Sequence, residues 1–281
     1  MTTRRDLLTG MWAGLLLRQL GQNTAHAMES LRFGVLPVMS ARASLETFQP
    51  LLDHLGRLGR QRPELITTPN FQELYRRISE GWFDFALIPP HMARLAQVDL
   101  GWQPMVSCAP DHRSQLLALE QGGPAGVEDL RGGGIAVLDR SALVVLIALE
   151  ALRQRGLREG RDFSLLETRS YESSRLAVVQ GRAQAFVSRS QGFFNEAQRD
   201  RFRILLDAGS LPGYVFAASP RLSPIARYHL AQHLLSFAAT PEAAPMLARL
   251  GYQSMVATTG EGLRQLDPYL DSTRAALSAA G

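Results

Sequence analysis

The sequence is poor in cysteine, with Cys108 as the single example among 281 residues. One thiol cannot form an intramolecular disulfide, so the chain is not one of the small disulfide-rich secreted folds. Beyond its first 27 residues it also lacks any apolar stretch that approaches the ~20 residues needed to cross a bilayer. We therefore expect a fold held by hydrophobic cores, with no membrane-spanning helix in the body of the chain.

A concentrated patch of positive charge is missing as well. The formal net charge is only +4, and arginine is spread along the chain instead of forming a basic stripe with interleaved aromatic residues. Proteins that bind the phosphates of nucleic acids carry such a stripe. Nucleic acid is therefore not expected among the partners.

The composition that remains is that of an ordinary globular protein. Hydrophobic residues make up 46% of the chain and charged residues 20%, which provides apolar material for more than one core. A single lobe of this length would be large, so two lobes of ~100 to 150 residues each are expected.

The first 27 residues have the features of an export signal. Residues 3–8 (TRRDLL) match a twin-arginine consensus, an apolar run follows at 10–17, and the small residues Ala25 and Ala27 form a cleavage site. We expect export to the periplasm by the twin-arginine route, with cleavage after Ala27. The apolar run is short and is ended by Arg18, which argues against a retained anchor. Removing three arginines and one aspartate with the signal lowers the formal net charge from +4 to +2.

Strands and helices are predicted in alternation after the signal. Apolar runs of strand length alternate with segments whose apolar residues recur at helical spacing. Strands are predicted at 31–37, 64–68, 83–88, 102–109, 114–119, 134–138, near 165, at 185–188, 203–206 and 214–218, and helices at 45–58, 71–81, 142–155, 224–250 and 260–280. This alternation predicts an α/β fold whose sheets are mostly parallel and flanked by helices.

Two breaks divide the predicted elements into two lobes. The polar residues 111–113 form the first break, and the segment 209–213, rich in proline and glycine, forms the second. We expect the chain to cross between lobes at both places. Lobe 1 then comprises residues 28–110 and 213–281, and lobe 2 comprises residues 111–212, with a hinge made of the two crossings.

Several short strings occur in an order that resembles the periplasmic phosphate, phosphite and phosphonate binding proteins of ABC transporters. They are GVLP at 34–37, FD at 83–84 followed by PHMARLAQ at 90–97 and GWQP at 101–104, VEDLRG at 127–132, and AVVQGRA at 177–183. The resemblance covers essentially the whole chain after the signal. It implies a type II periplasmic-binding fold whose two lobes close on a small oxyanion.

The resemblance places the anion site at residues 139–142, where the family carries a serine–threonine pair that holds phosphonate oxygens. Ser141 fits as the cap of the helix that follows, with its hydroxyl and nearby amides facing the ligand, whereas Ala142 lacks the second hydroxyl. Helix capping alone also accounts for Ser141. The two roles can coexist, because the N–H groups at a helix N-terminus bind anions.

Ser40 and His91 are further candidates, each placed after a predicted strand. Ser40 corresponds to a polar position on the ligand side of the family's first strand, and an ordinary loop serine is the alternative. His91 follows the strand at 83–88 at its carboxyl end, where open α/β sheets bind their ligands. It can donate a hydrogen bond to an oxyanion in either charge state, or it can have a structural role at the start of the next helix.

Tyr171, Glu172 and Gln184 align with residues that contact ligand in the family. Tyr171 and Glu172 take the places of a histidine and an acidic residue, and Gln184 takes the place of an aspartate. The resemblance implies that this aspartate helps to bind the amino group of aminoalkylphosphonates. A neutral Gln184 therefore argues against a ligand that carries a cation, although Glu172 could partly replace the aspartate or lie on a solvated loop.

Cys108 supports an alternative ligand. Some members of this superfamily resemble arsenite-sensing partners of periplasmic sensor kinases, which use a cysteine in the cleft because arsenic(III) is thiophilic. Cys108 lies near the first expected crossing, so a thiol ligand is conceivable. Its neighbours Val106 and Ala109 equally suit a buried strand.

No residues can be paired into an enzyme's active site. His229 and His233 are four apart on a predicted helix, but no third metal ligand is evident. The glycines at 132–134 lack the lysine of a phosphate-binding loop, and no nucleophile elbow is present. We therefore expect no enzyme, no metal and no cofactor.

The sequence thus predicts a periplasmic solute-binding protein that captures phosphate, phosphite or phosphonate for an ABC-transporter permease, and that is a monomer. The alternative is a ligand sensor that presents its closed form to a membrane sensor kinase.

Overall fold

The computed structural model describes residues 30–59, 62–168, 170–190 and 200–278. The predicted twin-arginine signal and its cleavage site after Ala27 lie outside these ranges.

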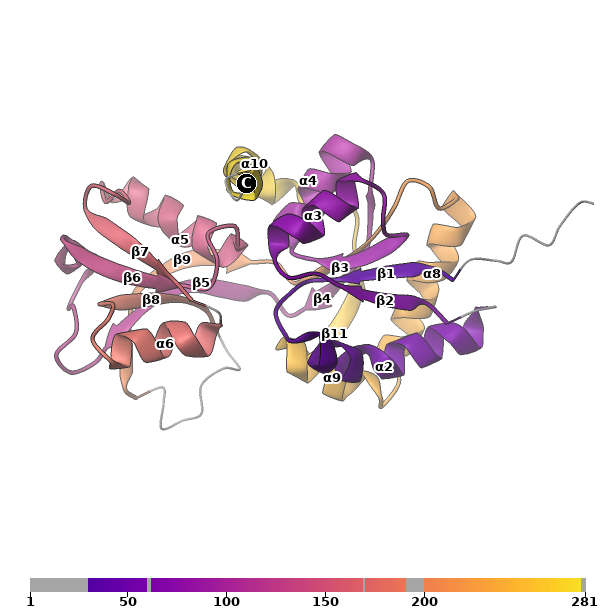
Figure 1. Ribbon diagram of the computed structural model, residues 1–281, viewed down its shortest axis with the longest axis horizontal. Coiled ribbons are helices and arrows are strands. Elements are labelled where there is room, and N and C mark those ends of the chain that lie inside the picture. The colour runs from indigo at the N-terminus through magenta and orange to yellow at the C-terminus, as the bar shows by residue number, and fades with distance from the viewer. Residues whose placement is uncertain (1–29, 60–61, 169, 191–199, 279–281) are drawn as a thin grey trace, which may run out of the picture. The chain divides into compact units, whose positions relative to one another are not determined.

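Two separate β-sheets organise the described chain (Figure 1). Sheet A has the strand order β11-β4-β10-β3-β1-β2. Its strands are β1 (Arg32–Val35), β2 (Glu64–Thr67), β3 (Phe85–Ile88), β4 (Gln103–Ala109), β10 (Val215–Ala218) and β11 (Ser254–Ala257). The helices of this part are α2 (Ala41–Leu58), α3 (Phe71–Ser79), α4 (Pro90–Leu100), α8 (Pro224–Ala238) and α9 (Ala243–Leu250). We call the described residues 30–109 and 215–278 part A.

Sheet B has the strand order β7-β6-β8-β5-β9. Its strands are β5 (His112–Leu119), β6 (Gly133–Val137), β7 (Phe163–Glu167), β8 (Ala185–Arg189) and β9 (Phe202–Leu211). Helices α5 (Leu143–Gln154) and α6 (Tyr171–Val179) cover its two opposite faces (Figure 1), and the short 3-10 helix η1 (Val127–Leu130) precedes β6. We call the described residues 112–211 part B.

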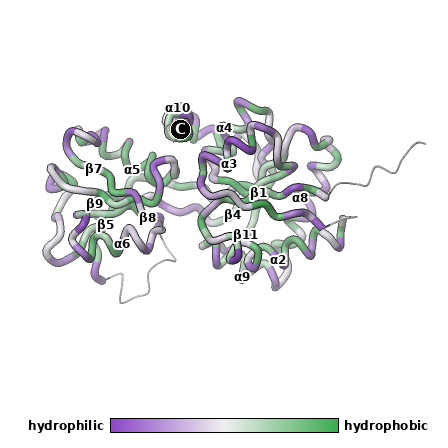
Figure 2. Tube along the Cα trace, in the orientation of Figure 1, coloured by the Kyte–Doolittle hydropathy of each residue, from purple (hydrophilic) through white to green (hydrophobic). Residues whose placement is uncertain are grey.

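The central strands of both sheets are buried on both faces. Every residue of β3 (FALI), β8 (AFVSR) and β10 (VFAA) is buried, whereas the edge strands β2 and β11 are largely accessible. A strand covered by helices on both sides needs apolar residues at consecutive positions instead of alternate ones. In Figure 2, hydrophobic residues lie along the strands of each sheet.

The expectation of mostly parallel sheets is corrected, because both sheets are mixed. Parallel pairing joins β1 with β2 and β3 in sheet A, and β6 with β7 and β8 in sheet B. Strands β4, β10 and β11, and likewise β5 and β9, pair antiparallel with their neighbours. The antiparallel strands include all four that carry the chain between the two sheets, and of these β10 and β5 lie directly beside the parallel strands, next to β3 and β8.

The chain passes between the sheets at two places. Strand β4 ends at Ala109 and β5 begins at His112, while β9 ends at Leu211 and β10 begins at Val215. The first crossing is therefore shorter than the break predicted at residues 111–113, because His112 and Arg113 already belong to β5.

The C-terminal part differs from the sequence prediction in two ways. The helix predicted at 224–250 is two helices, since α8 ends at Ala238 and α9 begins at Ala243 after a turn that contains Pro241. Strand β11 was not expected, and the helix predicted at 260–280 is the 3-10 helix η2 (Arg264–Tyr269) followed by α10 (Leu270–Ser278). Helix α10 packs on α4 and also contacts α5. Within the described ranges, no helix combines the length and apolar character needed to cross a bilayer.

Candidate functional site

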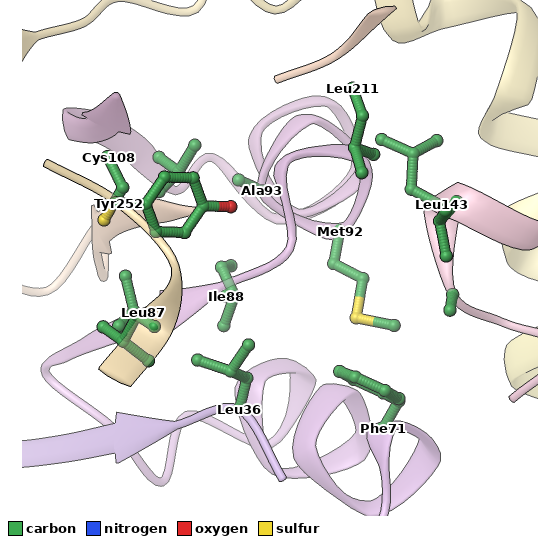
Figure 3. Packing of buried hydrophobic residues seen from close by; sticks show 14 of the residues in the cluster. Leu36, Phe71, Leu87, Ile88, Met92, Ala93, Cys108, Leu143, Leu211 and Tyr252 are labelled. Carbon is green, nitrogen blue, oxygen red and sulfur yellow. The ribbon is translucent and has the colours of Figure 1, made fainter. Parts of the chain in front are cut away.

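A pocket lies where residues of the two parts meet near the crossings, and we call it the central pocket. Its wall is mainly apolar and aromatic, and its volume of about 30 Å³ is room for about two water molecules. Part A and the second crossing contribute Val38, Phe71, Pro89, Pro90, Pro212, Tyr214 and Tyr252, and part B contributes Leu138, Ala142, Leu143, Val144, Tyr171, Arg189 and Leu211. Figure 3 shows Phe71, Leu143, Leu211 and Tyr252 in this region.

The first turn of α5 brings backbone donors to the central pocket. Ala142 is the N-cap of this helix, and Leu143 and Val144 are its first helical residues. In the part of the chain that the structure describes, the N–H groups of Leu143 and Val144 have no hydrogen-bond acceptor. Both residues line the pocket. Unpaired N–H groups at the positive end of a helix dipole form an anion-binding position.

Ser141 is placed differently from the expectation. It is fully buried and precedes the N-cap instead of occupying it, so the prediction that Ser141 caps the helix is wrong. Its backbone N–H and its hydroxyl both donate to Oδ1 of Asp139, at 2.7 and 2.6 Å. The protein's own carboxylate therefore occupies the two donors that were expected to face an oxyanion.

Arg189, at the carboxyl end of β8, supplies the positive charge of the central pocket. The side chain is buried, and its guanidinium carbon lies 5.9, 5.3 and 5.4 Å from the ring centres of Tyr171, Tyr214 and Tyr252. Nη1 donates to the hydroxyl of Tyr252 at 3.2 Å, and Nη2 donates to the carbonyl of Leu250 at 2.7 Å. These contacts fix the guanidinium at the pocket wall and surround it with aromatic faces.

The charges in this cluster are set by burial and by neighbours. Burial disfavours the charge of Arg189, but the oxygens of Tyr214, Tyr252 and Tyr171 outweigh this effect and raise its pKa. Burial raises the pKa of Tyr171 and of Tyr252 above the ordinary tyrosine value, so both remain neutral phenols. Among the described residues, the wall therefore includes the positive charge of Arg189 beside the neutral phenols of Tyr171 and Tyr252.

His91 lies behind the pocket wall and joins the two parts. The side chain is completely buried on α4, and its Nε2 donates to the carbonyl of Ser141 at 2.8 Å. Its Nδ1 has no partner among the described residues. Burial lowers the pKa of His91 to about 4, despite the opposing hydrogen bond to Ser141. His91 is therefore neutral near pH 7, and the ring does not line the central pocket.

Ser40 caps helix α2 and lies in a different hollow. It is exposed, and its hydroxyl accepts from the N–H of Ala43 at 3.2 Å. The hollow around it is formed by the loops that follow β1 and β2 and also contains Ser44, Thr67 and Thr68. The structure thus supports a capping role for Ser40 and does not place it with Arg189.

Of the three aligned residues of part B, only Tyr171 lines the central pocket. Glu172 is exposed and pairs with Arg175 of its own helix. Gln184 is exposed just before β8, at the opposite end of that strand from Arg189, and its side chain lies beside Gly133. The expectation that Gln184 takes a ligand-contacting position is not met by this geometry, because a β-strand of five residues separates it from the pocket.

Cys108 lies in the interior of β4, where it pairs with Met255 of β11, and it is buried (Figure 3). Burial raises the pKa of its thiol to about 12, although nearby Arg189 favours the thiolate. A thiol of this kind is a small core residue and is protonated at neutral pH. The geometry favours the buried-strand alternative over a ligand in the cleft.

Among the described residues, no group of three or more histidine, cysteine or acidic side chains could hold a metal ion. The rings of His229 and His233 lie 6.4 Å apart on α8, at the surface of part A. They form a surface pair outside the central pocket.

Sequence reasoning missed Arg189, the one charged side chain among the described residues of the pocket wall. A signal was present: the arginine directly follows the apolar run at 185–188, at the carboxyl end of a buried strand, which is where ligands bind in open α/β sheets. The same rule, which makes His91 a candidate, also applies to the end of this strand.

Comparison with known proteins identifies the relatives of this chain. A family model described as the periplasmic substrate-binding protein of phosphonate ABC transporters matches residues 33–263. No curated protein sequence matches the chain.

Solved structures with the same fold include three binding proteins. A binding-protein component of an ABC phosphonate transporter from Pseudomonas aeruginosa is 16% identical, with a TM-score of 0.72 and 89% of each chain covered. PhnD1 from Prochlorococcus marinus, in complex with methylphosphonate, is 11% identical with a TM-score of 0.74, and the match covers 88% of this chain and 98% of that one. The aliphatic sulphonate binding protein SsuA from Escherichia coli is 16% identical with a TM-score of 0.61, at 88% and 94% coverage.

These likenesses confirm the predicted two-sheet fold of type II periplasmic binding proteins. The family match covers most of the chain and agrees with the resemblance that the sequence strings indicated. The chain belongs to the periplasmic substrate-binding proteins of ABC phosphonate transporters.

Proposed function

We propose that the central pocket is the ligand site, and that it holds the anionic group of a phosphonate-like oxyanion for delivery to the permease. The observation that carries this proposal is that buried Arg189 lines the same pocket as Leu143 and Val144, whose N–H groups have no acceptor among the described residues. A buried cation and a helix N-terminus together compensate an anion that has been removed from water.

The pocket is also consistent with binding without catalysis. The described residues of its wall pair no nucleophile with a base, since their polar side chains are one arginine and three tyrosines. In this proposal, part A and part B act as two lobes whose boundaries are the crossings near residues 110 and 212. The protein works as a monomer.

Replacing Arg189 tests the site directly. We expect Arg189→Gln to weaken binding of methylphosphonate by about 10- to 100-fold, since a hydrogen bond to a charged group contributes ~1.5 to 3 kcal/mol. Isothermal titration calorimetry of the chain from Met28 onward measures this. Arg175→Gln is the matched control, because Arg175 is likewise buried in part B but does not line the pocket.

Equal affinity in Arg189→Gln and in the control would show that the ligand binds elsewhere. A thermal unfolding curve of each variant without ligand separates loss of binding from loss of folding.

The route to the periplasm is proposed from the sequence. The twin-arginine motif at residues 3–8 and the small residues Ala25 and Ala27 support export of the folded chain with cleavage after Ala27. Replacing Arg4 and Arg5 by lysine should leave the protein in the cytoplasm, and N-terminal sequencing of the exported protein should start at Met28. Unchanged export of the double variant would contradict this route.

A further inference from the structure

We propose that the hollow beside the start of α2, which we call the α2 hollow, is a second anion site that takes a small inorganic oxyanion such as sulfate or phosphate. It shares no lining residue with the central pocket, so the inference does not depend on the function proposed for that pocket. The volume of the α2 hollow is about 370 Å³. Its described wall consists of Leu36, Pro37, Met39, Ser40, Ala41, Ser44, Thr67, Thr68 and Pro69.

The topology of sheet A places the α2 hollow at the carboxyl ends of two neighbouring strands. Strands β1 and β2 pair in parallel, with Val35 opposite Thr67 at their ends. The loops that follow both strands form the wall, together with the first turn of α2. Ligands bind outside the carboxyl ends of parallel strands because the helices that follow present the N–H groups of their first turns there.

The start of α2 supplies a backbone donor to the hollow. This helix has 18 residues, Ser40 is its N-cap, and its first turn contains no acidic residue. The N–H groups of Ala43 and Ser44 donate to Ser40, whereas the N–H of Ala41 has no acceptor among the described residues. Ala41 therefore offers an unpaired N–H at the positive end of a long helix dipole, with no carboxylate in the first turn to balance that end.

A buried hydroxyl in the same wall indicates an occupant. Ser44 follows Ser40 and Ala41 by one helical turn, so the side chains of these residues lie on one face of α2. Ser44 is only 2% exposed and lines the hollow, and its hydroxyl has no hydrogen-bond partner in the part of the chain that the structure describes. Buried hydroxyls are normally paired. The partner of this hydroxyl is therefore supplied by the molecule that occupies the hollow.

The remaining polar groups of the wall determine the class of ligand. Thr67, at the end of β2, adds a hydroxyl without a partner among the described residues. The hydroxyl of Ser40 accepts from Ala43 but donates to no described group, whereas Thr68 donates to the carbonyl of Asn70 at 3.4 Å. The described wall contains no charged side chain, so no carboxylate competes with an anion or attracts a cation. Several free donors at the positive end of a helix match an oxyanion, which has several acceptor oxygens.

An NMR titration that resolves single amide groups tests the α2 hollow separately from the central pocket. Sodium sulfate is added to the isotope-labelled chain from Met28 onward, and sodium chloride keeps the ionic strength constant so that general screening does not change. We expect the amide resonance of Ala41 to shift until it saturates. The amide resonances of Leu143 and Val144 report on the central pocket in the same spectra, so sulfate binding at either place is measured independently.

Hydroxyl deletions identify the groups that bind sulfate. Ser44→Ala should weaken the sulfate affinity measured at Ala41 by roughly tenfold or more, since a hydrogen bond to a charged group is lost. Thr67→Val keeps the branched shape, removes the second hydroxyl and should act in the same direction. Ser223→Ala is the matched control, because Ser223 caps α8 as Ser40 caps α2 but does not line the hollow. Without sulfate, Ser44→Ala should not lower the thermal unfolding midpoint, because its hydroxyl has no described partner to lose.

Three results would overturn the second anion site. The first is an Ala41 resonance that does not respond to sulfate, or that responds equally to chloride. The second is a sulfate affinity at Ala41 that neither Ser44→Ala nor Thr67→Val reduces. The third is a response to glycerol in place of sulfate, because the hollow would then bind a neutral polyol. Each of these results leaves the proposed function of the central pocket untouched.

Discussion

Arg189 retains its charge although the side chain is almost inaccessible to solvent. Three tyrosine rings face the guanidinium, and the carbonyl of Leu250 accepts from it at 2.7 Å. Leu250 is the last residue of α9, where the unpaired carbonyls and the negative end of the helix dipole favour a cation. The tyrosine rings and this carbonyl therefore offset the cost of removing the guanidinium from water.

Cys108 is the second residue whose surroundings decide its chemistry. With 1% exposure and a thiol pKa of about 12, it should not react with a thiol reagent such as Ellman's reagent in the native protein at pH 8. In guanidinium chloride the same thiol should react at the rate of free cysteine. Measuring both rates checks this, with the methylphosphonate response of Cys108→Ser as the control.

Fast labelling of the native protein, or a rise in its unfolding midpoint with arsenite, would instead support a thiol-based sensor. The reactivity of Cys108 therefore distinguishes the transport alternative from the thiol-based sensor.

Some of the residues predicted from the sequence line the central pocket and others do not, for identifiable reasons. Ala142 and Tyr171 line the pocket because motif order locates the turn before α5 and the start of α6. Motif order does not resolve which end of a short strand a residue occupies, so Gln184 was aligned to the site while Arg189, at the other end of the same strand, was not. The capture of the donors of Ser141 by Asp139 depends on local geometry that no spacing rule encodes.

At the scale of elements, long or strongly patterned segments were predictable. The helix predicted at 45–58 appears as α2 (Ala41–Leu58), whose start is fixed by Ser40 as its cap. The edge strand β11 was missed because it has four residues with only Met255 buried, which leaves no hydrophobic pattern. The helical pattern predicted at 224–250 is divided by the turn at 239–242, which contains Pro241. Proline alone does not mark such a break, because Pro50 lies inside α2.

The sequence pattern also could not predict that both sheets contain parallel and antiparallel pairs. A strand buried on both faces has the same apolar run whether its neighbour is parallel or antiparallel, as β3 and β10 show when they pair antiparallel. The direction of pairing follows from the two crossings. A strand that returns from the other sheet enters next to the βα units from the opposite end.

At the scale of the molecule, a few buried polar contacts join the two parts beside the central pocket. The ring of His91 on α4 donates to the carbonyl of Ser141 before α5, and Arg189 of β8 donates to Leu250 and Tyr252 of part A. Each contact pairs polar groups away from water, so separating the parts would leave buried polar groups without a partner.

The burial of His91 makes the stability of the whole molecule depend on pH. In the unfolded chain the histidine binds a proton below about pH 6.5, whereas in the native structure its pKa is about 4. Between these values the unfolded state holds more protons, so the free energy of unfolding decreases as the pH falls. The full contribution is present above pH 6.5, and about 3 kcal/mol of it is lost by pH 4.

Urea unfolding at pH 6.5 and pH 4 measures this loss. His91→Gln keeps a side-chain N–H donor without a titrating ring, so its stability should fall by about 3 kcal/mol less than that of the unaltered chain over the same interval. His229→Gln, at an exposed position of α8, should follow the unaltered chain. Burial also lowers the pKa of His54, His112 and His233, and the comparison between variants cancels their contribution. If the His91→Gln variant lost as much stability as the unaltered chain, the buried ring would not be the group that couples the joined parts to pH.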